Sequence, residues 1–515
     1  MPVYKVNVKW GKEKYDVELD SDEPPLLLKN VLYSLSGVSP ERMKLMIKGQ
    51  TVKDDDWGKI RLQDNMMFMM LGSKEVLPEA PKKKTMFLED MSDAQLATAL
   101  EMPCGLKNLG NTCYVNATLQ CLKSVPELRD ALNQFAGDIM LHGTIVAAHS
   151  ITAAIRETFR GMDKTAEGYL PIIMLQVLHA VYPHYAEKAE NGVWKQQDAN
   201  ELWTQVVKLL SEKLLGQPDR LAADVTVEGE TADMAVEAAS VAKTYSKSNI
   251  IEQYFGLEMS NIWKCIEAPD EAETSTVEYL FQLGCYISQE VKYMETGLRS
   301  RLQEQITKQS PSLGTDAVYT RTSRVQRLPA YLTIQFVRFF YKEKERVNAK
   351  ILKDVKFPLK LDMFEFCSPE LQQKLTPVRQ KFKEVEDKLI AEADRKKTAS
   401  ILGSEEGSEN KESNEPITME VDEAKIEYEP YSFDDDVGSN NSGYYELNAI
   451  LTHKGRSSSS GHYVAWVRRS GAYWIMFDDD KVSPVHEEDV VKLSGGGDWH
   501  SAYVLLYAPR RLQKV

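Results

Sequence analysis

The chain is 515 residues long, with 43% hydrophobic and 27% charged residues, which is enough for more than one compact domain. Its formal net charge is −14, and it has neither the basic stripe nor the aromatic platform typical of nucleic-acid-binding proteins. The N-terminus lacks the features of a signal peptide, and no apolar run approaches the roughly 20 residues of a transmembrane helix. We therefore expect a soluble protein, monomeric when free, that binds no nucleic acid and has no transmembrane segment.

Six cysteines are spread through the sequence without any Cys-x-x-Cys pair. In so long a chain this number is too small for a disulfide scaffold, and the spacing excludes a zinc ribbon. The pattern favours a reducing compartment. We expect a cytoplasmic and nuclear protein without a cofactor or a metal ion.

Two stretches near the N-terminus, 3–8 and 15–19, alternate apolar and polar residues on either side of Gly11 and predict a β-hairpin. A helix is predicted next, with Pro24 and Pro25 at its start and Gly37 as a left-handed C-cap. The apolar residues expected on one face of this helix are Leu28, Val31, Leu32 and Leu35. Two further strands, over 44–48 and 66–71, complete the unit.

The order and size of this unit resemble ubiquitin. The resemblance covers residues 3–72 and rests on KLMIKGQTV and MMFMML, which stand where ubiquitin carries its recognition patch. It implies a β-grasp ubiquitin-like domain over 1–75, with Met46, Met70 and Phe68 as an exposed apolar patch for a partner. Strand alternation leaves open whether Phe68 belongs to the core instead. Residues 76–99 lose their periodicity and gain proline and lysine, which predicts a flexible linker.

The segment GLKNLGNTCYVNATLQCL begins as a Gly- and Asn-rich loop and continues at helical spacing, which places Cys113 at a helix N-terminus. Backbone N–H groups and the positive end of the helix dipole stabilise a thiolate there, so Cys113 is the predicted nucleophile. Asn108, on the same loop, is a candidate donor to a developing oxyanion. Since most cysteines are buried apolar residues, packing roles are predicted for the others in apolar surroundings, namely Cys121, Cys265, Cys285 and Cys367.

The negative charge of the chain is concentrated in one segment. Residues 401–440 contain 13 acidic residues and two lysines and are poor in apolar side chains. Such a composition buries too little surface to offset chain entropy. We therefore predict a disordered acidic insertion over 398–442, acting as a solvated spacer or, less typically, as a docking tail.

A nucleophilic cysteine needs a base, and His462 stands in the most suitable context among eight histidines. A Ser- and Gly-rich loop precedes it and the strand-like segment HYVAWV contains it, so an imidazole there faces a cleft while the strand fixes its backbone. The histidines in apolar helical stretches are expected to be core or surface residues, namely His142, His149 and His179.

A third group must orient the imidazole, and YWIMFDDD supplies candidates. A tight turn at Ser470-Gly471 makes this segment an antiparallel return strand beside His462. Asp478 is the predicted orienting carboxylate. Asp479 remains an alternative, because strand alternation does not say which side chain points inward.

Four segments together resemble the ubiquitin-specific proteases: the cysteine box, LPAYLTIQFVRF, GHYVAWV and YWIMFDDDKV, which occur in the order of that family. The resemblance implies an α+β fold in which residues 100–512 form a papain-like domain of fingers, palm and thumb. The chain lacks the two Cys-x-x-Cys pairs that hold zinc in the fingers of many relatives.

The resemblance also implies a function: hydrolysis of the isopeptide bond after the C-terminal glycine of ubiquitin in ubiquitinated proteins. It makes Asp198 a residue that holds the ubiquitin tail, although its context alone predicts a helix N-cap. Aromatic side chains around Tyr463 are expected to narrow the cleft for the glycine tail.

The resemblance is strongest to proteasome-associated members of the family. It implies docking on the 26S proteasome regulatory particle through residues 1–75, and autoinhibition of the free enzyme by loops at 340–346 and 455–460. The serines of the second loop also suggest a phosphorylation switch. Two alternatives remain, a non-catalytic ubiquitin-binding adaptor and a hydrolase of another ubiquitin-like modifier.

Overall fold

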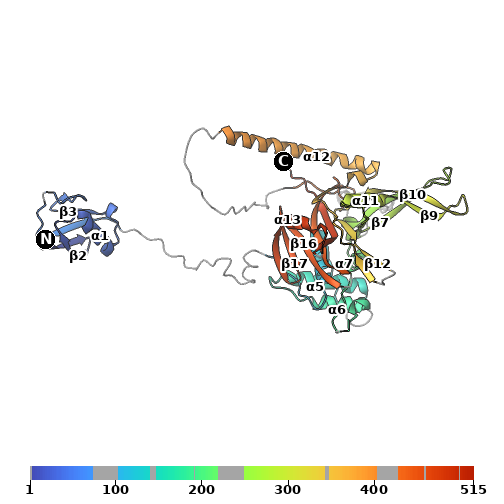
Figure 1. The fold of residues 1–515 in the computed structure, drawn as a ribbon, viewed down its shortest axis with the longest axis horizontal. Coiled ribbons are helices and arrows are strands. Elements are labelled where there is room, and N and C mark those ends of the chain that lie inside the picture. The colour runs from blue at the N-terminus through green and yellow to red at the C-terminus, as the bar shows by residue number, and fades with distance from the viewer. Residues whose placement is uncertain are drawn as a thin grey trace, which may run out of the picture. The chain divides into compact units, whose positions relative to one another are not determined.

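A computed structural model describes the chain in ten stretches, 3–58, 60–73, 102–139, 146–190, 192–217, 249–342, 347–402, 427–457, 460–497 and 499–514. The chain divides into two compact units, Met1–Met91 and Ser92–Val515. Figure 1 shows the N-terminal unit in blue, and each unit is described by itself.

The N-terminal unit is a β-grasp. Its elements are β1 (Val3–Trp10), β2 (Glu13–Asp20), α1 (Pro25–Ser36), a short 3-10 turn (Pro40–Arg42), β3 (Lys44–Ile47), β4 (Gln50–Thr51) and β5 (Met67–Leu71). The sheet order is β2-β1-β5-β3-β4, with β1 and β5 parallel. The C-cap of α1 is Gly37, at φ +71°, and its N–H donates to the Tyr33 carbonyl. The ubiquitin-like fold is thereby confirmed.

The predicted apolar patch of this unit is wrong in its register. Phe68 and Met70 are buried, whereas Met67, Met69 and Leu71 are 54%, 54% and 50% exposed. Neighbouring residues of a strand point to opposite faces, so a shift of one position exchanges the core and surface residues. Met46 of β3 pairs with Met69 and lies half-buried beside it.

The predicted apolar face of α1 is only half correct. Leu28 and Leu32 are buried, but Val31 and Leu35 are exposed. The buried stripe continues instead through Ser36, whose hydroxyl donates to the Leu32 carbonyl, a spacing of four residues on the core side.

In its described stretches, the second unit contains a helical layer and three sheets. The helices of the layer are α3 (Cys113–Lys123), α4 (Pro126–Gln134), α5 (Ala147–Met162), α6 (Ile172–Val181), a 3-10 turn (Pro183–Ala186), α7 (Ala199–Ser211) and α10 (Ile250–Phe255). Figure 1 shows α5, α6 and α7 gathered along one side of the strands β16 and β17. This layer corresponds to the predicted thumb.

The largest sheet corresponds to the palm and has the order β18-β17-β16-β15-β19-β11-β8, with β14 paired to β15. Its strands are β8 (Leu283–Tyr286), β11 (Leu332–Val337), β14 (Lys360–Asp362), β15 (Tyr444–Ser457), β16 (Ser460–Ser470), β17 (Tyr473–Asp478), β18 (Lys481–His486) and β19 (Ser501–Pro509). Successive side chains of β15 and β16 point to opposite faces of the sheet and so contribute to two separate cores. Leu451 and Ala465 pack with the helices, and Ile450 and Trp466 pack on the opposite face.

A separate four-stranded sheet corresponds to the fingers. Its strands are β6 (Leu257–Cys265), β7 (Thr274–Leu280), β9 (Gln303–Gln309) and β10 (Asp316–Arg327), in the order β7-β6-β10-β9. A two-stranded hairpin of β12 (Phe339–Lys342) and β13 (Val347–Lys350) completes the sheets. The α+β prediction, with its fingers, palm and thumb, is confirmed.

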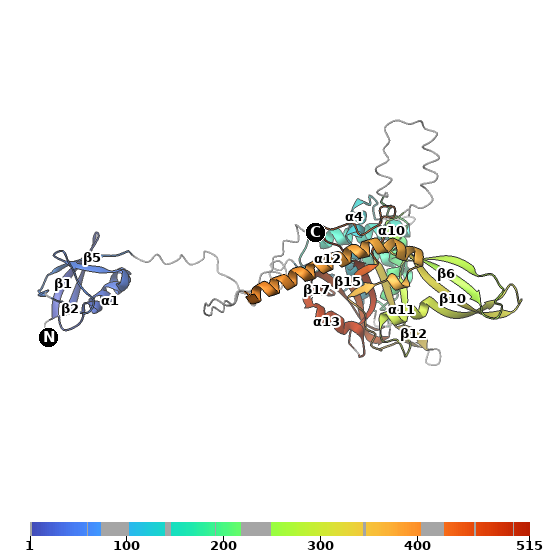
Figure 2. The same ribbon diagram turned by 90° about the horizontal axis from the view of Figure 1, so that it is seen from above.

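Further helices pack on the sheets or extend from them: α11 (Met294–Leu302), a 3-10 turn (Phe364–Phe366), α12 (Pro369–Leu402), α13 (Glu487–Val491) and a 3-10 turn (Lys492–Ser494). Figure 2 shows α12 as one long helix whose C-terminal part extends beyond the strands of the palm.

The predicted disordered insertion over 398–442 is too long. Residues up to Leu402 belong to α12, residues 403–426 lie outside the described stretches, and residues 427–442 pack against the rest of the second unit. In this last part Asp436 accepts two hydrogen bonds from Arg327, of 2.7 and 2.8 Å, and Tyr431 donates to Glu127. This polar segment is therefore packed in spite of its composition, because hydrogen bonds satisfy the polar groups that it buries.

Arg327 is the buried hub of that packing. Besides Asp436, its guanidinium donates to the carbonyls of Gly256 at 2.6 Å and Gln253 at 2.7 Å. Replacement Arg327→Met removes the charge partner of the Asp436 carboxylate, whose side chain is 31% exposed, and the donor to the two carbonyls, so we expect the free energy of unfolding to fall by about 3 kcal/mol. Chemical denaturation of the full chain measures this.

The matched control is Arg324→Met on the same strand, where the side chain is exposed and donates to the Glu365 carbonyl. For this variant the free energy of unfolding should fall by less than about 1 kcal/mol. Equal losses for the two variants contradict the assignment.

Candidate active site

The loop before Cys113 is folded by its own side chains. The Asn108 side-chain oxygen accepts hydrogen bonds from the backbone N–H groups of Gly110 at 2.9 Å and Thr112 at 3.2 Å. Gly110 and Asn111 take left-handed conformations, with φ of +100° and +55°. These turns end at Thr112, the N-cap of α3, and Cys113 is the first residue of the helix. The prediction of Cys113 at a helix N-terminus is correct.

Helix α3 lies at the centre of the unit. Every residue from Cys113 to Leu122 is buried, since α3 packs against both the other helices and strands β15 to β17 of the palm. The positive end of the α3 dipole, at which Cys113 stands, therefore lies in a site that is largely shielded from water, which strengthens its effect on an anion.

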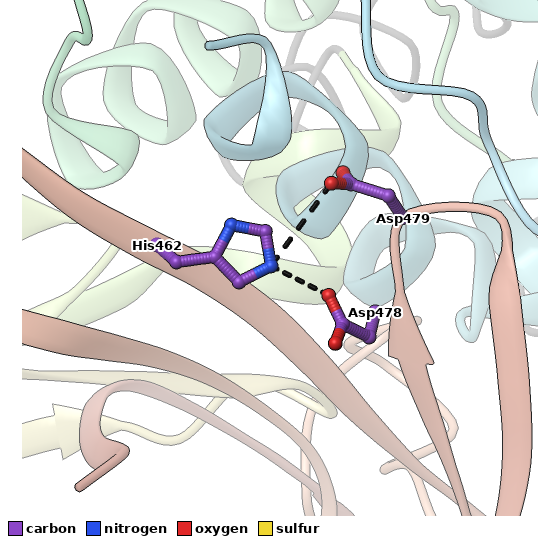
Figure 3. A group of neighbouring side chains, drawn as sticks. All are labelled: His462, Asp478 and Asp479. Carbon is purple, nitrogen blue, oxygen red and sulfur yellow. Dashed lines mark hydrogen bonds and ion pairs between the residues drawn. The ribbon is translucent and has the colours of Figure 1, made fainter.

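His462 lies in the third position of β16, and the predicted return strand is β17. The two strands pair antiparallel, with Ala465 opposite Phe477, and Gly471 lies in the turn between them at φ +53°. This register brings His462 Nε2 to 2.5 Å from Asp478 Oδ1. Figure 3 shows the carboxylate turned toward that ring nitrogen.

The imidazole of His462 has partners on both sides. Hydrogen bonds with Asp478 and with the Cys113 thiol raise the pKa of His462 to about 10, although burial by itself lowers this pKa. Since Nε2 is used by Asp478, Nδ1 is the nitrogen that faces Cys113. The same bond lowers the pKa of Asp478. The imidazole is therefore a cation over the neutral pH range, placed between a carboxylate and the thiol.

Asp479 has a different environment from Asp478. Its carboxylate accepts hydrogen bonds from Asn116 Nδ2 at 2.8 Å and Asn108 Nδ2 at 2.9 Å, and lies 4.0 Å from His462 Nε2. Burial raises the pKa of Asp479, while the two asparagines lower it. Of the two candidate carboxylates, Asp478 is thus the one that contacts His462, and Asp479 joins the cysteine loop to the palm.

The prediction for Asn108 as an oxyanion donor stays a prediction. One N–H of its amide is used by Asp479. An amide nitrogen carries two hydrogens, so the other remains for a bound substrate.

The two side chains predicted to bind substrate come from the start of α7 and from β16. Asp198 is the N-cap of α7, accepting from the N–H groups of Asn200 at 2.7 Å and Glu201 at 3.2 Å, so the N-cap prediction is correct. Its two oxygens also accept from the Tyr503 hydroxyl, at 2.8 Å each. Burial raises the pKa of Asp198 and these bonds oppose the rise. Its role as a tail-binding residue remains a prediction.

Tyr463 is buried, with its ring 4.7 Å from that of His453. Its hydroxyl is buried and has no hydrogen-bond partner among the described residues. Phe339 of β12 packs edge-on against Tyr503 and His453, at centroid distances of 5.0 and 5.3 Å. The rings of His453 and Tyr503 therefore lie beside Tyr463, with centroid distances of 4.7 and 6.4 Å, and the role of Tyr463 in narrowing a cleft stays a prediction.

Several residues of the site were not predicted, namely Asn116, Tyr503, His453 and His500. Asn116 is one helical turn after Cys113, and its amide reaches Asp479 across the interface between the helices and the palm. No local sequence pattern marks such a contact, because its two residues are 363 positions apart.

The other cysteines and histidines agree with packing roles where they are described. All six cysteines are free and buried, and burial raises the pKa of Cys285 and Cys367 to about 12. His149 packs edge-on against Phe135, and His179 packs on Trp194. His142 lies outside the described stretches.

The two predicted gating loops are mostly hairpin. Strand β15 continues to Ser457 and β16 begins at Ser460, so the loop is shorter than predicted, and 458–459 lie outside the described stretches. The tip of the β12–β13 hairpin, 343–346, also lies outside them.

In the described part of the chain, His462, Asp478 and Asp479 are also the group whose ligand atoms, all within 4.8 Å of one another, could surround a metal ion. Each of these atoms already takes part in a hydrogen bond to a neighbouring side chain. A histidine held between a carboxylate and a thiol at a helix N-terminus defines instead the class of cysteine hydrolases with a Cys-His-Asp arrangement.

Comparison with known proteins identifies the family. The family model described as "Ubiquitin carboxyl-terminal hydrolase" matches residues 104–507. The chain is 39% identical to "Ubiquitin carboxyl-terminal hydrolase 6" of Arabidopsis thaliana, over 98% of each chain. It is 38% identical to "Ubiquitin carboxyl-terminal hydrolase 14" of Caenorhabditis elegans, over 100% of this chain and 94% of that one. The chain belongs to this family and is a cysteine-type deubiquitinase.

Among solved structures, one titled "Structure of the SAGA Ubp8/Sgf11/Sus1/Sgf73 DUB module bound to ubiquitin aldehyde" matches with a TM-score of 0.48 and 17% identity, over 79% of this chain and 70% of that chain. In the described stretches of this chain, no helix has the length and apolar character needed to cross a membrane.

The contact between Asp478 and His462 predicts a change in pH dependence. The protonated form of His462 is present below its pKa, so activity that needs this proton is lost as pH rises through about 10. Replacement Asp478→Asn removes the main cause of the raised pKa. We expect the alkaline limb of kcat/KM to move to lower pH and kcat to fall at least about tenfold, measured with a fluorogenic ubiquitin C-terminal substrate.

Asp480→Asn is the matched control, because Asp480 is exposed and lies in the same run of aspartates. Its profile should equal that of the unchanged protein. An unmoved alkaline limb in the Asp478 variant contradicts the role assigned to that carboxylate.

Proposed function

We propose that this deubiquitinase hydrolyses the isopeptide bond after the C-terminal glycine of ubiquitin, with Cys113 as nucleophile, His462 as acid and base, and Asp478 as the residue that orients His462. The observation that carries this proposal is the double contact of His462, with Asp478 at 2.5 Å and with the Cys113 thiol. Asn108 and the N–H groups at the start of α3 are the proposed oxyanion donors.

The reaction takes two steps in this geometry. The Cys113 thiolate attacks the glycine carbonyl carbon, the C–N bond breaks, and His462 gives its proton to the leaving lysine amine, which leaves a thioester. His462, now neutral, takes a proton from water as the water attacks the thioester. The carboxyl group of ubiquitin and the Cys113 thiolate with its His462 imidazolium are restored.

Asp198 and Tyr463 support a site for the extended tail of ubiquitin. The carboxylate of Asp198 is held by Tyr503 and by the start of α7, so its position is fixed before a substrate binds. Tyr463 and the ring of His453 beside it are the proposed aromatic lining of that site. A tail that ends in glycine passes such a lining where larger side chains clash.

Covalent capture tests the catalytic proposal. Ubiquitin carrying a C-terminal electrophile should form an adduct with the full chain and none with Cys113→Ala, because the thiolate is the attacking atom. Mass spectrometry locates the adduct. Cys121→Ala is the matched control, since Cys121 is buried in the same helix and burial raises its pKa.

The same experiment separates the alternatives. A chain that binds ubiquitin but gives no adduct, with or without proteasomes, is a non-catalytic adaptor. Faster adduct formation with the probe of another ubiquitin-like modifier makes that modifier the substrate.

We further propose that the N-terminal unit docks on the 26S proteasome regulatory particle and that the free enzyme is autoinhibited, in a cytoplasmic and nuclear protein. In support, β3 and β5 present an exposed apolar surface, here called the sheet patch, made of Met46, Met67, Met69 and Leu71. Lys9 and Lys44, the strand neighbours of Met69 and Leu71, border it. Flexible apolar side chains with a polar rim suit a protein partner.

The hairpin β12–β13 supports the proposal of autoinhibition. Phe339 at its base packs on Tyr503, which in turn holds Asp198, so the hairpin is joined to Asp198 through one side chain. Movement of this hairpin on docking would open the lining.

Replacement Met69→Asp tests the docking surface. A charge in the sheet patch should abolish co-sedimentation with purified proteasomes and the gain in activity they give, while activity without proteasomes stays the same. Leu35→Asp is the matched control, because Leu35 is 52% exposed on α1 of the same unit. Equal binding by both variants argues against the sheet patch.

A further inference from the structure

Three of the eight histidines, His453, His462 and His500, gather at neighbouring strand ends of the palm. In the registers of β15, His453 pairs with Tyr463 and with Ser501, the residues that follow His462 and His500. His453 and His500 are buried, and the proposed reaction uses neither of them. Their position beside the acid and base raises the question of what they do.

Thr452 fixes the ring of His500. The Thr452 hydroxyl donates its one hydrogen to the Val464 carbonyl at 3.1 Å and accepts from Trp466 Nε1 at 3.0 Å. Its remaining contact, with His500 Nδ1 at 3.2 Å, must therefore be one in which His500 donates. His500 is thus held as the tautomer with hydrogen on Nδ1. Thr452 belongs to β15, and its partners Val464 and Trp466 belong to β16, the strand that carries His462.

His500 in turn packs on His462. The ring centroids are 6.4 Å apart, with an interplanar angle of 68°, which is an edge-to-face contact. Burial alone does not hold the acid–base pair, because the side chains of His462 and Asp478 are 32% and 40% exposed. In the described part of the chain, His462 is the hydrogen-bond partner of the Asp478 side chain, so this carboxylate is not anchored elsewhere.

We propose that His500 is a positioning residue for the acid–base pair: its ring, fixed by Thr452, keeps His462 against Cys113 and Asp478. The inference rests on the proposed function and deepens it. Without this ring His462 can turn away from both partners while keeping its place on β16. A misplaced acid–base group slows the chemical step more than it weakens substrate binding.

The electrostatics suit this role. Burial, together with the nearby charges of His462, Lys454 and Lys350, lowers the pKa of His500 to about 4, while Asp478 opposes them. His500 is therefore neutral at the pH where His462 is a cation. A neutral ring packs on the imidazolium without competing for Asp478 as a second cation would.

The test uses two pairs of variants in the full chain. His500→Phe keeps a ring but removes the donor to Thr452, whereas His500→Asn keeps an N–H near the position of Nδ1 but removes the ring. Thr452→Val removes the hydroxyl but keeps the shape, and Thr452→Ser keeps the hydroxyl. The substrate is a fluorogenic ubiquitin C-terminal derivative, and kcat, KM and the alkaline limb of kcat/KM are measured.

For His500→Phe and Thr452→Val we expect kcat to fall about tenfold with KM changed less than about twofold. The alkaline limb should move to lower pH by about one unit, because a displaced His462 loses part of its contact with Asp478. Thr452→Ser should return kcat to within about threefold of the unchanged protein. His500→Asn keeps a donor but lacks the ring that packs on His462, so its kcat should fall about as far as that of His500→Phe. The double variant that combines His500→Phe with Thr452→Val should be no worse than either single variant, since both act through one contact.

The control is His486→Phe, because His486 is exposed on β18. Its kcat and alkaline limb should be unchanged. If His500→Phe does not fold, as judged by thermal melting, the comparison of Thr452→Val with Thr452→Ser gives the same readouts.

Two results overturn the inference. One is an unchanged kcat in the variants that break the contact, and the other is a fall in kcat with an unmoved alkaline limb, which marks a purely structural role. Cys113→Ala and His462→Ala, measured alongside, separate this failure from that of the proposed function. If those two variants are inactive and the His500 variants are normal, only the positioning role is lost.

Discussion

The catalytic arrangement depends on the turn after β17, where Asp479 joins the cysteine helix to the histidine strands. The carbonyl of Asp479 accepts from the Leu106 N–H at 2.9 Å, and its carboxylate accepts from the amides of Asn108 and Asn116. A Cβ on Gly105 would lie 2.7 Å from that same carbonyl, so only glycine permits this approach. The distance between thiol and imidazole is set here, because the two come from different layers of the fold.

Neighbouring groups of one type take different roles in this site because their environments differ. Asp478 is partly exposed and paired with an imidazolium, so it stays charged, whereas Asp479 is more buried and serves as an anchor for two amides. The three clustered histidines divide in the same way. His462 has two polar partners that favour its cation, while burial keeps His453 and His500 neutral.

Much of the precision of the site comes from buried polar contacts between layers. Tyr503 of β19 holds Asp198 of the helical layer, and Arg327 of the fingers holds Asp436 of the segment that returns to the palm. Removal of Tyr503 or Arg327 takes away the donor to a carboxylate of another layer, so each contact orders the layers more strongly than its net energy suggests. Loops alone would not hold groups to the fraction of an ångström that catalysis needs.

The sequence alone predicted the elements that depend on local chemistry. The N-terminal hairpin, the Gly37 cap, the start of α3 at Cys113 and the β16–β17 hairpin follow from turn residues, caps and period-two patterns. The acid–base pair came from the same patterns, together with the resemblance to a family. Two of the predictions were wrong. Alternation predicted a strand over 66–71 but did not show which face is buried, so Phe68 and Met69 were exchanged. Polar composition predicted disorder for residues 427–442, which are packed.

Only the tertiary structure decided which aspartate contacts His462, and only it joined Asn116 to Asp479, Tyr503 to Asp198 and His500 to Thr452. Such pairs lie far apart in the chain, and each side chain by itself fits many surroundings. Residue type and spacing therefore determined the chemistry this protein carries, whereas the packing of helices on the palm sheet decided which groups meet and how each is charged.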